Sequence, residues 1–267
     1  GATYSRFIFA APWIVLFSFI FLLSTNVSIP DLESQFLLFA VGGGLAQILA
    51  TVCVILVFKS RNFAVGITLK KTEVILTALV GLILIGEGVS TISMFLICLG
   101  GAGVFFLSKK VSSVDRSNFS ILNKSAVYGL LSGLLFAISA VCYRSATLSV
   151  VSDLVYLRAG FTLLIVILSQ SFVMTIWLAL FEPGQIKLVW LERKKGFWVG
   201  VTSLGGSFFW FTAFTLQNAA YVKAVGQIEL IFSLLITTLF FKERILNREI
   251  LGMLLIGISA LGLILVV

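Results

Sequence analysis

Long apolar segments repeat along the whole chain, and each is long enough to cross a lipid bilayer as a helix. A hydrocarbon core about 30 Å thick needs roughly 20 apolar residues in helical form. The runs are continuous rather than alternating, which excludes the strands of a transmembrane barrel. The sequence therefore predicts an all-α membrane protein with nine helices, over 7–23, 36–58, 63–85, 91–107, 125–143, 157–181, 197–216, 219–241 and 250–267.

The composition excludes a soluble enzyme. Charged residues make up 11% of the chain, against about 25% in soluble domains, and the mean hydropathy is +1.14. Histidine, the commonest general base and metal ligand, is absent from the sequence. Cys53, Cys98 and Cys142 lie inside apolar runs without metal-binding spacing. We therefore expect no enzymatic activity, no cofactor and no metal site.

An internal repeat relates the two halves of the chain. The segment from Asn62 to Leu107 aligns with the segment from Asn218 to Leu263 at a constant offset of 156 residues. At that offset Glu73 meets Glu229, and Glu87 meets Glu243. Charged residues are rare within these helices, so coincident glutamates indicate a true repeat.

The repeat predicts a domain organisation. We expect a first repeat over 1–108, a linker over 109–124 and a second repeat over 125–267. The helix at 125–143 has no counterpart before Tyr4, so we expect an intact protein of ten helices whose first helix is absent from this sequence. Five helices per repeat place the two repeats in opposite orientations, the plan of many secondary transporters.

The repeated pieces resemble the drug/metabolite transporter superfamily, in particular the EamA-like ten-helix exporters. The resemblance rests first on Gly86-Glu87 and Lys242-Glu243-Arg244, each of which is followed by a Gly-rich helix. It rests also on the segments Lys71–Val74 and Gly226–Leu230. The third ground is an arginine near the start of the second helix of each repeat, Arg6 and Arg158. It implies two inverted five-helix repeats, and a substrate cavity lined notably by the helices at 63–85 and 219–241.

The positive charges report orientation rather than nucleic-acid binding. The net charge is +8, and most of the 19 Lys and Arg residues fall on one side of the predicted helices, whereas only Arg144 and Arg158 fall on the other. The positive-inside rule makes the basic side cytoplasmic. We therefore expect a multi-pass protein of a bacterial-type plasma membrane.

Two glutamates are the leading candidates for a binding site. Glu73 and Glu229 lie about ten residues into their helices, which is ~15 Å at ~1.5 Å per residue and thus near the bilayer midplane. Ionisable residues at that depth are costly and usually functional. They would bind a cationic group or carry a proton. The alternative is a structural role, capping helix ends or pairing with lysine.

Basic and amide side chains surround these glutamates in the sequence. Lys71 and Lys223 are candidates for contacting a carboxylate or phosphate. Lys223 has the alternative of reaching toward the membrane surface. Lys70 lies three residues before Glu73, so we expect the two side chains to pair. Gln227, the repeat partner of Lys71, is a candidate for polar contact with substrate or with another helix.

Three further residues complete the predicted substrate site. Tyr221 carries a hydroxyl that needs a partner. Trp210 belongs to the run Phe208–Phe211, whose four rings cover all faces of a helix, so some must meet lipid or core. Asn218 begins a helix, where capping is the alternative. Arg6 and Arg158 also begin helices, and we interpret them as interfacial anchors in preference to gate residues.

These features together predict a secondary transporter working by alternating access, an exporter of amino acids or similar zwitterions. Its expected partners are a small-molecule substrate and the lipid bilayer, with protons as a candidate coupling ion and no nucleic acid. The oligomeric state stays open. The alternatives are a structural or partner membrane protein that transports nothing, and a transporter of amines, nucleosides or phosphorylated metabolites.

Overall fold

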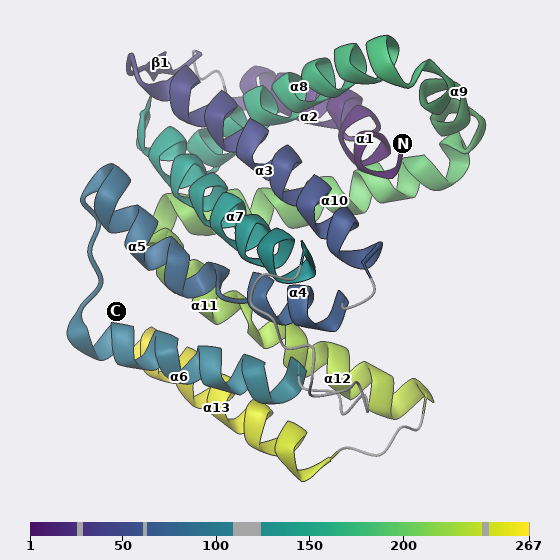
Figure 1. Ribbon diagram of the computed structural model, residues 1–267. Helices are drawn as coiled ribbons and strands as arrows, with labels where there is room; N and C mark the ends of the chain where they lie inside the picture. Colours follow the sequence, from purple (N-terminus) through teal and green to yellow (C-terminus); the bar gives the residue numbers. More distant parts are fainter. Residues whose placement is uncertain (26–28, 61–62, 109–123, 242–245, 267) are drawn as a thin grey trace. The chain divides into compact units, whose positions relative to one another are not determined.

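The protein is built almost entirely from helices, as the apolar runs predict (Figure 1). The computed structural model describes residues 1–25, 29–60, 63–108, 124–241 and 246–266. Asn62, Glu243 and the predicted linker up to residue 123 lie outside these ranges. Two compact units divide the chain, and the boundaries between them fall within helices α3 (Phe36–Phe58) and α7 (Lys124–Leu148) and between residues 217 and 218.

Unit 1 comprises Gly1–Ile48 and Ser139–Gln217. Its longest helices pack against each other, and the short α9 links the end of α8 to the start of α10 (Figure 1). A cluster of buried apolar side chains around Phe7 and Leu178 joins α1, α8 and α9. Besides parts of α3 and α7, its helices are α1 (Ala2–Ile8), α2 (Ala11–Thr25), α8 (Val155–Phe181), α9 (Pro183–Leu191) and α10 (Arg193–Leu216).

A two-stranded antiparallel pairing also lies in unit 1. Strand β1 (Asp31–Leu32) pairs with β2 (Val150–Val151), with Asp31 opposite Val151 and Leu32 opposite Val150. The pairing ties the segment before α3 to the segment before α8.

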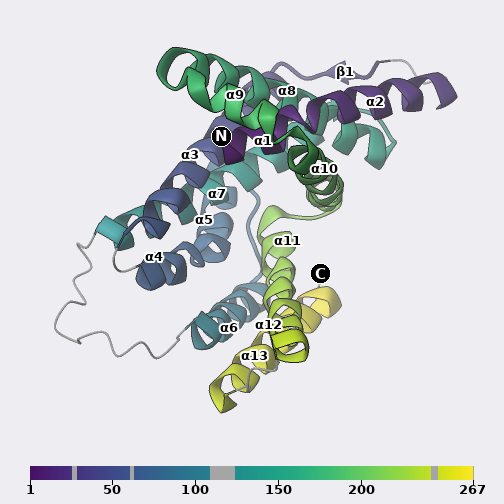
Figure 2. The same ribbon diagram turned by 90° about the vertical axis from the view of Figure 1, so that its right-hand side faces the viewer.

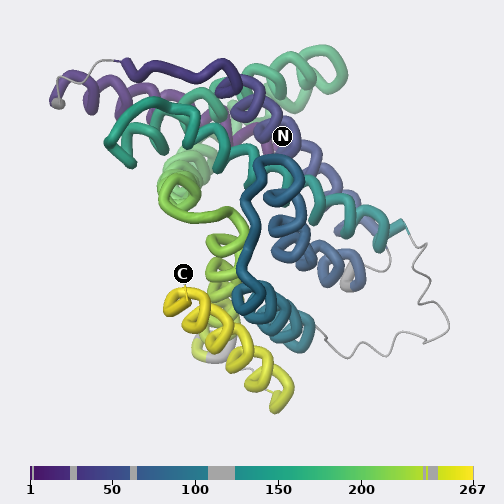
Figure 3. The backbone as a smooth tube through the Cα atoms, turned by 90° about the vertical axis from the view of Figure 1, so that its left-hand side faces the viewer, coloured from purple at the N-terminus to yellow at the C-terminus, as the bar shows by residue number. Residues whose placement is uncertain are grey.

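Unit 2 comprises Leu49–Ile138 and Asn218–Val267. Helices α6 and α13 pack side by side along their lengths (Figure 3), and α11 leads into α12 (Figure 2). The buried apolar core of unit 2 includes Val74, Ile97 and Ala220. Besides parts of α3 and α7, its helices are α4 (Phe63–Lys70), α5 (Glu73–Ile85), α6 (Thr91–Ser108), α11 (Ala219–Gly226), α12 (Ile228–Phe241) and α13 (Asn247–Val266).

Glycines set the close approach of α6 and α13. A Cβ on Gly103 would lie 2.7 Å from the carbonyl oxygen of Gly252, and a Cβ on Gly252 would lie 2.8 Å from that of Gly103. Small residues of this kind let membrane helices pack backbone to backbone. Ser259 adds a hydrogen bond by donating from its hydroxyl to the carbonyl of Leu96 at 2.6 Å.

Among the residues that the structure describes, seven helices are long and apolar enough to cross a membrane, and the chain is a multi-pass membrane protein. They cover Thr3–Ser24, Phe36–Phe58, Lys124–Leu148, Val155–Phe181, Arg193–Leu216, Ala219–Ile236 and Asn247–Val266, with a shorter apolar helix at Thr91–Leu107. The predicted class, an all-α membrane protein, is therefore confirmed, while the inverted five-helix repeats and the absent first helix stay predictions.

Three of the predicted helices contain a turn that the sequence did not predict. The run at 7–23 is divided after Ile8, the run at 63–85 after Lys70, and the run at 219–241 after Gly226. The segment before α10, which carried no predicted helix, forms α9. Hydropathy detects the length of an apolar segment but does not detect a local change in backbone hydrogen bonding, which explains why these turns were not predicted.

Candidate functional site

Two of the helix interruptions lie in unit 2 at positions related by the repeat. Between α4 and α5, Lys71 and Thr72 donate their backbone N–H groups to carbonyls three residues earlier, at 3.1 Å each. Between α11 and α12, the N–H of Gln227 donates to the carbonyl of Ala224, also at 3.1 Å. This i to i−3 pattern tightens the helix for one turn. The interruptions are therefore compact turns, each dividing an apolar segment into two shorter helices.

Charged side chains flank both interruptions with the same polarity. Lys70 lies in the last turn of α4 and Lys223 in the last turn of α11. Glu73 lies in the first turn of α5 and Glu229 in the first turn of α12. A helix dipole favours cations at its C-terminus and anions at its N-terminus. Each interruption thus creates favourable positions for one cation and one anion.

The charges pair across the two interruptions. Lys223 Nζ lies 3.8 Å from Glu73 Oε1, and Lys71 Nζ lies 3.8 Å from Glu229 Oε1. Lys70 Nζ lies 3.7 Å from Glu73 Oε2, which confirms the pairing predicted from their spacing. We call these five residues the lysine–glutamate cluster. All three distances exceed those of a direct hydrogen bond. The two charges of each pair therefore attract each other without forming a hydrogen bond.

The two glutamates differ in how open they are. The Glu73 side chain is 9% exposed, whereas that of Glu229 is 64% exposed. Three lysines and two glutamates carry a formal net charge of +1 if all are ionised. The cluster therefore offers ammonium groups for an anionic group and one accessible carboxylate for a cationic group.

An aromatic ring on α7 completes the cluster, and it was not among the predicted site residues. The ring of Phe136 lies 4.7 Å from Lys70 Nζ and 5.8 Å from Lys223 Nζ, within the range of cation–π attraction. The close approach of α7 depends on Gly133, where a Cβ would lie 2.9 Å from the carbonyl of Lys70. Gly129 and Gly133 form a small-xxx-small pattern, the one sequence signal that points to this contact.

Gln227 lies within the second interruption and is 5% exposed. Its Nε2 donates to the carbonyl of Lys223 at 3.3 Å. Its Oε1 is buried and accepts no hydrogen bond from the part of the chain that the structure describes. Buried polar atoms are rarely left without a partner, so this oxygen is available to a ligand donor or a water molecule.

Tyr221 and Asn218 also lie in unit 2, but their polar groups are engaged. The Tyr221 hydroxyl accepts a hydrogen bond from the backbone N–H of Ser90 at 3.4 Å. Asn218 Oδ1 accepts from the backbone N–H of Ala220 at 2.8 Å and so caps α11. The capping interpretation of Asn218 is confirmed, while substrate contact by either residue stays a prediction.

Trp210 belongs to unit 1, whereas the other seven predicted site residues belong to unit 2. Its ring packs on Phe214, with centroids 5.7 Å apart. In the same run Phe209 is exposed and Phe211 is buried against Tyr143, as expected for rings on all faces of one helix. The structure thus brings Glu73, Lys71, Lys223 and Glu229 together, and Trp210 is not part of that cluster.

Comparison with known proteins supports the fold alone. No protein-family model matches the chain, and no curated protein matches it. Among the solved structures, a protein crystal structure aligns with this chain at a TM-score of 0.67 and 17% sequence identity. The alignment covers 99% of this chain and 86% of that one. The chain therefore shares its fold with a known protein over nearly its whole length.

Proposed function

We propose that the protein is a secondary transporter of small polar metabolites, of the EamA-like kind within the drug/metabolite transporter superfamily. The observation that carries the proposal is the lysine–glutamate cluster, which gathers five ionisable side chains at two helix interruptions. Interrupted helices with charged residues at their ends are how many transporters build a substrate site within the membrane.

The depth of the cluster supports a functional role. Glu229 lies near the middle of the apolar span Ala219–Ile236, whose length suffices to cross a bilayer, and Lys223 lies one turn from its start. On insertion scales a charge at the centre of such a span costs about 2.5–3.5 kcal/mol. Pairing reduces this cost but does not explain why five charges are present, because an apolar cluster would serve stability as well.

The proposed substrate is an amino acid or a similar zwitterion, exported by alternating access. Lys71 and Lys223 supply ammonium groups for its carboxylate, and the exposed carboxylate of Glu229 accepts its ammonium group. Glu73 is enclosed by Lys70 and Lys223, so its role is to hold those lysines in place. The sequence contains no GxxxxGK[ST] motif for nucleotide hydrolysis, and a proton gradient is the proposed driving force.

A flux measurement in proteoliposomes tests the proposal. Counterflow of a panel of radiolabelled amino acids should show saturable transport by the native protein. E229Q should raise KM for the best substrate about tenfold, because one charge-assisted contact contributes about 1.4 kcal/mol or more. E229Q is the more informative variant, since the exposed side chain of Glu229 contributes little to stability.

Glu192 provides the matched control. It is an exposed glutamate paired with Lys195 at 2.8 Å in unit 1, so E192Q should leave the flux unchanged. Unaltered saturable flux in both E73Q and E229Q would contradict the site. Absence of flux for every compound in the panel, with folded native protein, would favour a structural or partner role.

A further inference from the structure

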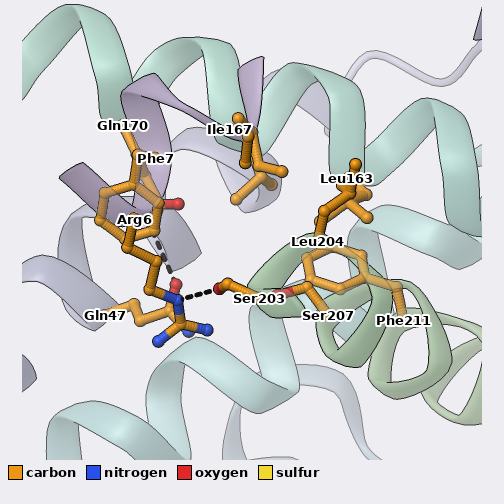
Figure 4. Close-up of a pocket in the computed structure, with 12 residues that line it drawn as sticks. Arg6, Phe7, Gln47, Leu163, Ile167, Gln170, Ser203, Leu204, Ser207 and Phe211 are labelled. Atoms are coloured by element: carbon orange, nitrogen blue, oxygen red, sulfur yellow. Dashed lines mark hydrogen bonds between the residues drawn. The ribbon is translucent and has the colours of Figure 1, made fainter. Parts of the chain in front are cut away.

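A second polar site lies in unit 1 and involves none of the residues of the lysine–glutamate cluster. Four helices of unit 1, α1, α3, α8 and α10, line a pocket (Figure 4). The centre of a water-sized sphere can move through about 20 Å³ of this pocket, so a group larger than one water molecule fits in it. The polar side chains in its wall are Arg6, Gln47, Gln170, Ser203 and Ser207.

Arg6 carries the only charge in this wall. It lies within the apolar span Thr3–Ser24, and the wall contains no acidic residue. Among the residues that the structure describes, no carboxylate forms an ion pair with Arg6. A guanidinium group stays protonated in proteins, so this cation has no counter-charge among the described residues. The structure adds that the Arg6 side chain lines a pocket, and the interpretation of Arg6 as an interfacial anchor stays a prediction.

Arg6 and Ser203 both carry hydrogen-bond donors that a ligand in the pocket can use. Arg6 uses its Nε–H to donate to Ser203 Oγ, as Figure 4 shows. No acceptor for its Nη groups is found among the described residues, and a guanidinium group binds a carboxylate through two parallel hydrogen bonds. The Ser203 hydroxyl, which accepts from Arg6, keeps its own proton to donate. Ser207 lies one turn further along the same face of α10.

A hydrogen-bonded network holds the opposite wall in place. Gln170 Nε2 donates to Gln47 Oε1 at 2.8 Å and to the carbonyl of Gly44 at 3.1 Å. The Tyr143 hydroxyl donates to the same Gln47 oxygen at 3.0 Å. The rest of the lining is apolar and includes Phe7 and Phe211. One cation, two hydroxyls and an apolar surround suit a monoanion on an apolar body better than a doubly charged phosphate.

We propose that this pocket binds the carboxylate group of a small apolar acid, with Arg6 as its counter-ion. The site is independent of the transport function proposed above, since it lies in the other unit and its test measures binding rather than flux. Propionate is the probe, because it presents a carboxylate on a short apolar body. Propanamide, of nearly the same shape but uncharged, is its matched control.

Thermal unfolding of the detergent-purified protein measures the binding. At ten times its Kd, sodium propionate should raise Tm by about 3 °C over sodium chloride at equal ionic strength. Propanamide should give no rise, and inorganic phosphate a smaller one. R6Q should abolish the propionate shift, whereas R193Q, at an exposed arginine of α10, should retain it.

Two further variants separate the pocket from the lysine–glutamate cluster and from misfolding. K223Q should retain the propionate shift, and loss of the shift in K223Q with retention in R6Q would overturn the proposal. S207L keeps the arginine but fills the pocket, so it should abolish the shift even where R6Q fails to fold. A shift that persists in S207L, or an equal shift with phosphate, would also overturn it.

Discussion

At the scale of single residues, the repeat relates Glu73 and Glu229, yet their surroundings differ. Lys70 and Lys71 of the first repeat correspond to Gly226 and Gln227 of the second. Glu73 therefore has Lys70 beside it on its own segment and Lys223 across from it, whereas Lys71 is the ion-pair partner that the described residues provide for Glu229. This asymmetry explains why one glutamate is enclosed and the other is open.

The asymmetry predicts unequal stability effects of the same substitution. E73Q leaves Lys70 and Lys223 without their carboxylate, and removing one partner of a buried ion pair costs about 3–5 kcal/mol. E229Q removes a pair with one exposed partner, which is worth about 1 kcal/mol or less. Thermal unfolding in detergent should therefore show a large fall in Tm for E73Q and a small one for E229Q. Equal falls would contradict the enclosed position of Glu73.

At the scale of helices, glycine determines which pairs of elements come into backbone contact. Along α6, Gly103 faces the backbone of α13, whereas a Cβ on Gly101 would meet only Ile75 Cδ1, at an ordinary 3.8 Å. Both glycines belong to the same sequence run and look equivalent there. Only the packing of α6 on α13 distinguishes them.

Alanine substitution tests that distinction. G103A forces α6 and α13 apart, and overpacking of this kind costs about 1–3 kcal/mol. G101A meets no obstacle and replaces glycine by the best helix former, so it should leave stability unchanged or raise it slightly. Thermal unfolding of the two variants under identical detergent conditions makes the comparison. A loss of stability in G101A as large as in G103A would contradict the helix contact.

At the scale of the whole molecule, each compact unit contains segments from both halves of the sequence. Unit 1 combines residues 1–48 with 139–217, and unit 2 combines residues 49–138 with 218–267. The lysine–glutamate cluster follows this pattern, because its residues come from both halves and lie in one unit. The predicted division into repeats at 1–108 and 125–267 describes the sequence, whereas the contacts follow a different division.

The orientation in the membrane can be tested at the two ends of α8. Asp153 precedes α8 and is exposed, and Lys194, in the first turn of α10, is exposed beyond its other end. In a protein whose three cysteines are replaced by alanine, the positive-inside rule predicts that D153C reacts with an impermeant maleimide from outside the cell. K194C should react only from the cytoplasmic side. The reverse pattern would contradict the assigned orientation.

The sequence by itself determined the membrane class, most helix locations and the two glutamates of the candidate site. These follow from local rules, because each span must be apolar over the thickness of the bilayer and a charge within it is conspicuous. Tertiary structure alone decided that Lys223 pairs with Glu73 and Lys71 with Glu229, that Phe136 covers two of the lysines, and that Arg6 lines a pocket. Such contacts join helices distant in the chain, and hydropathy records how long a helix is but not which neighbour each of its faces meets.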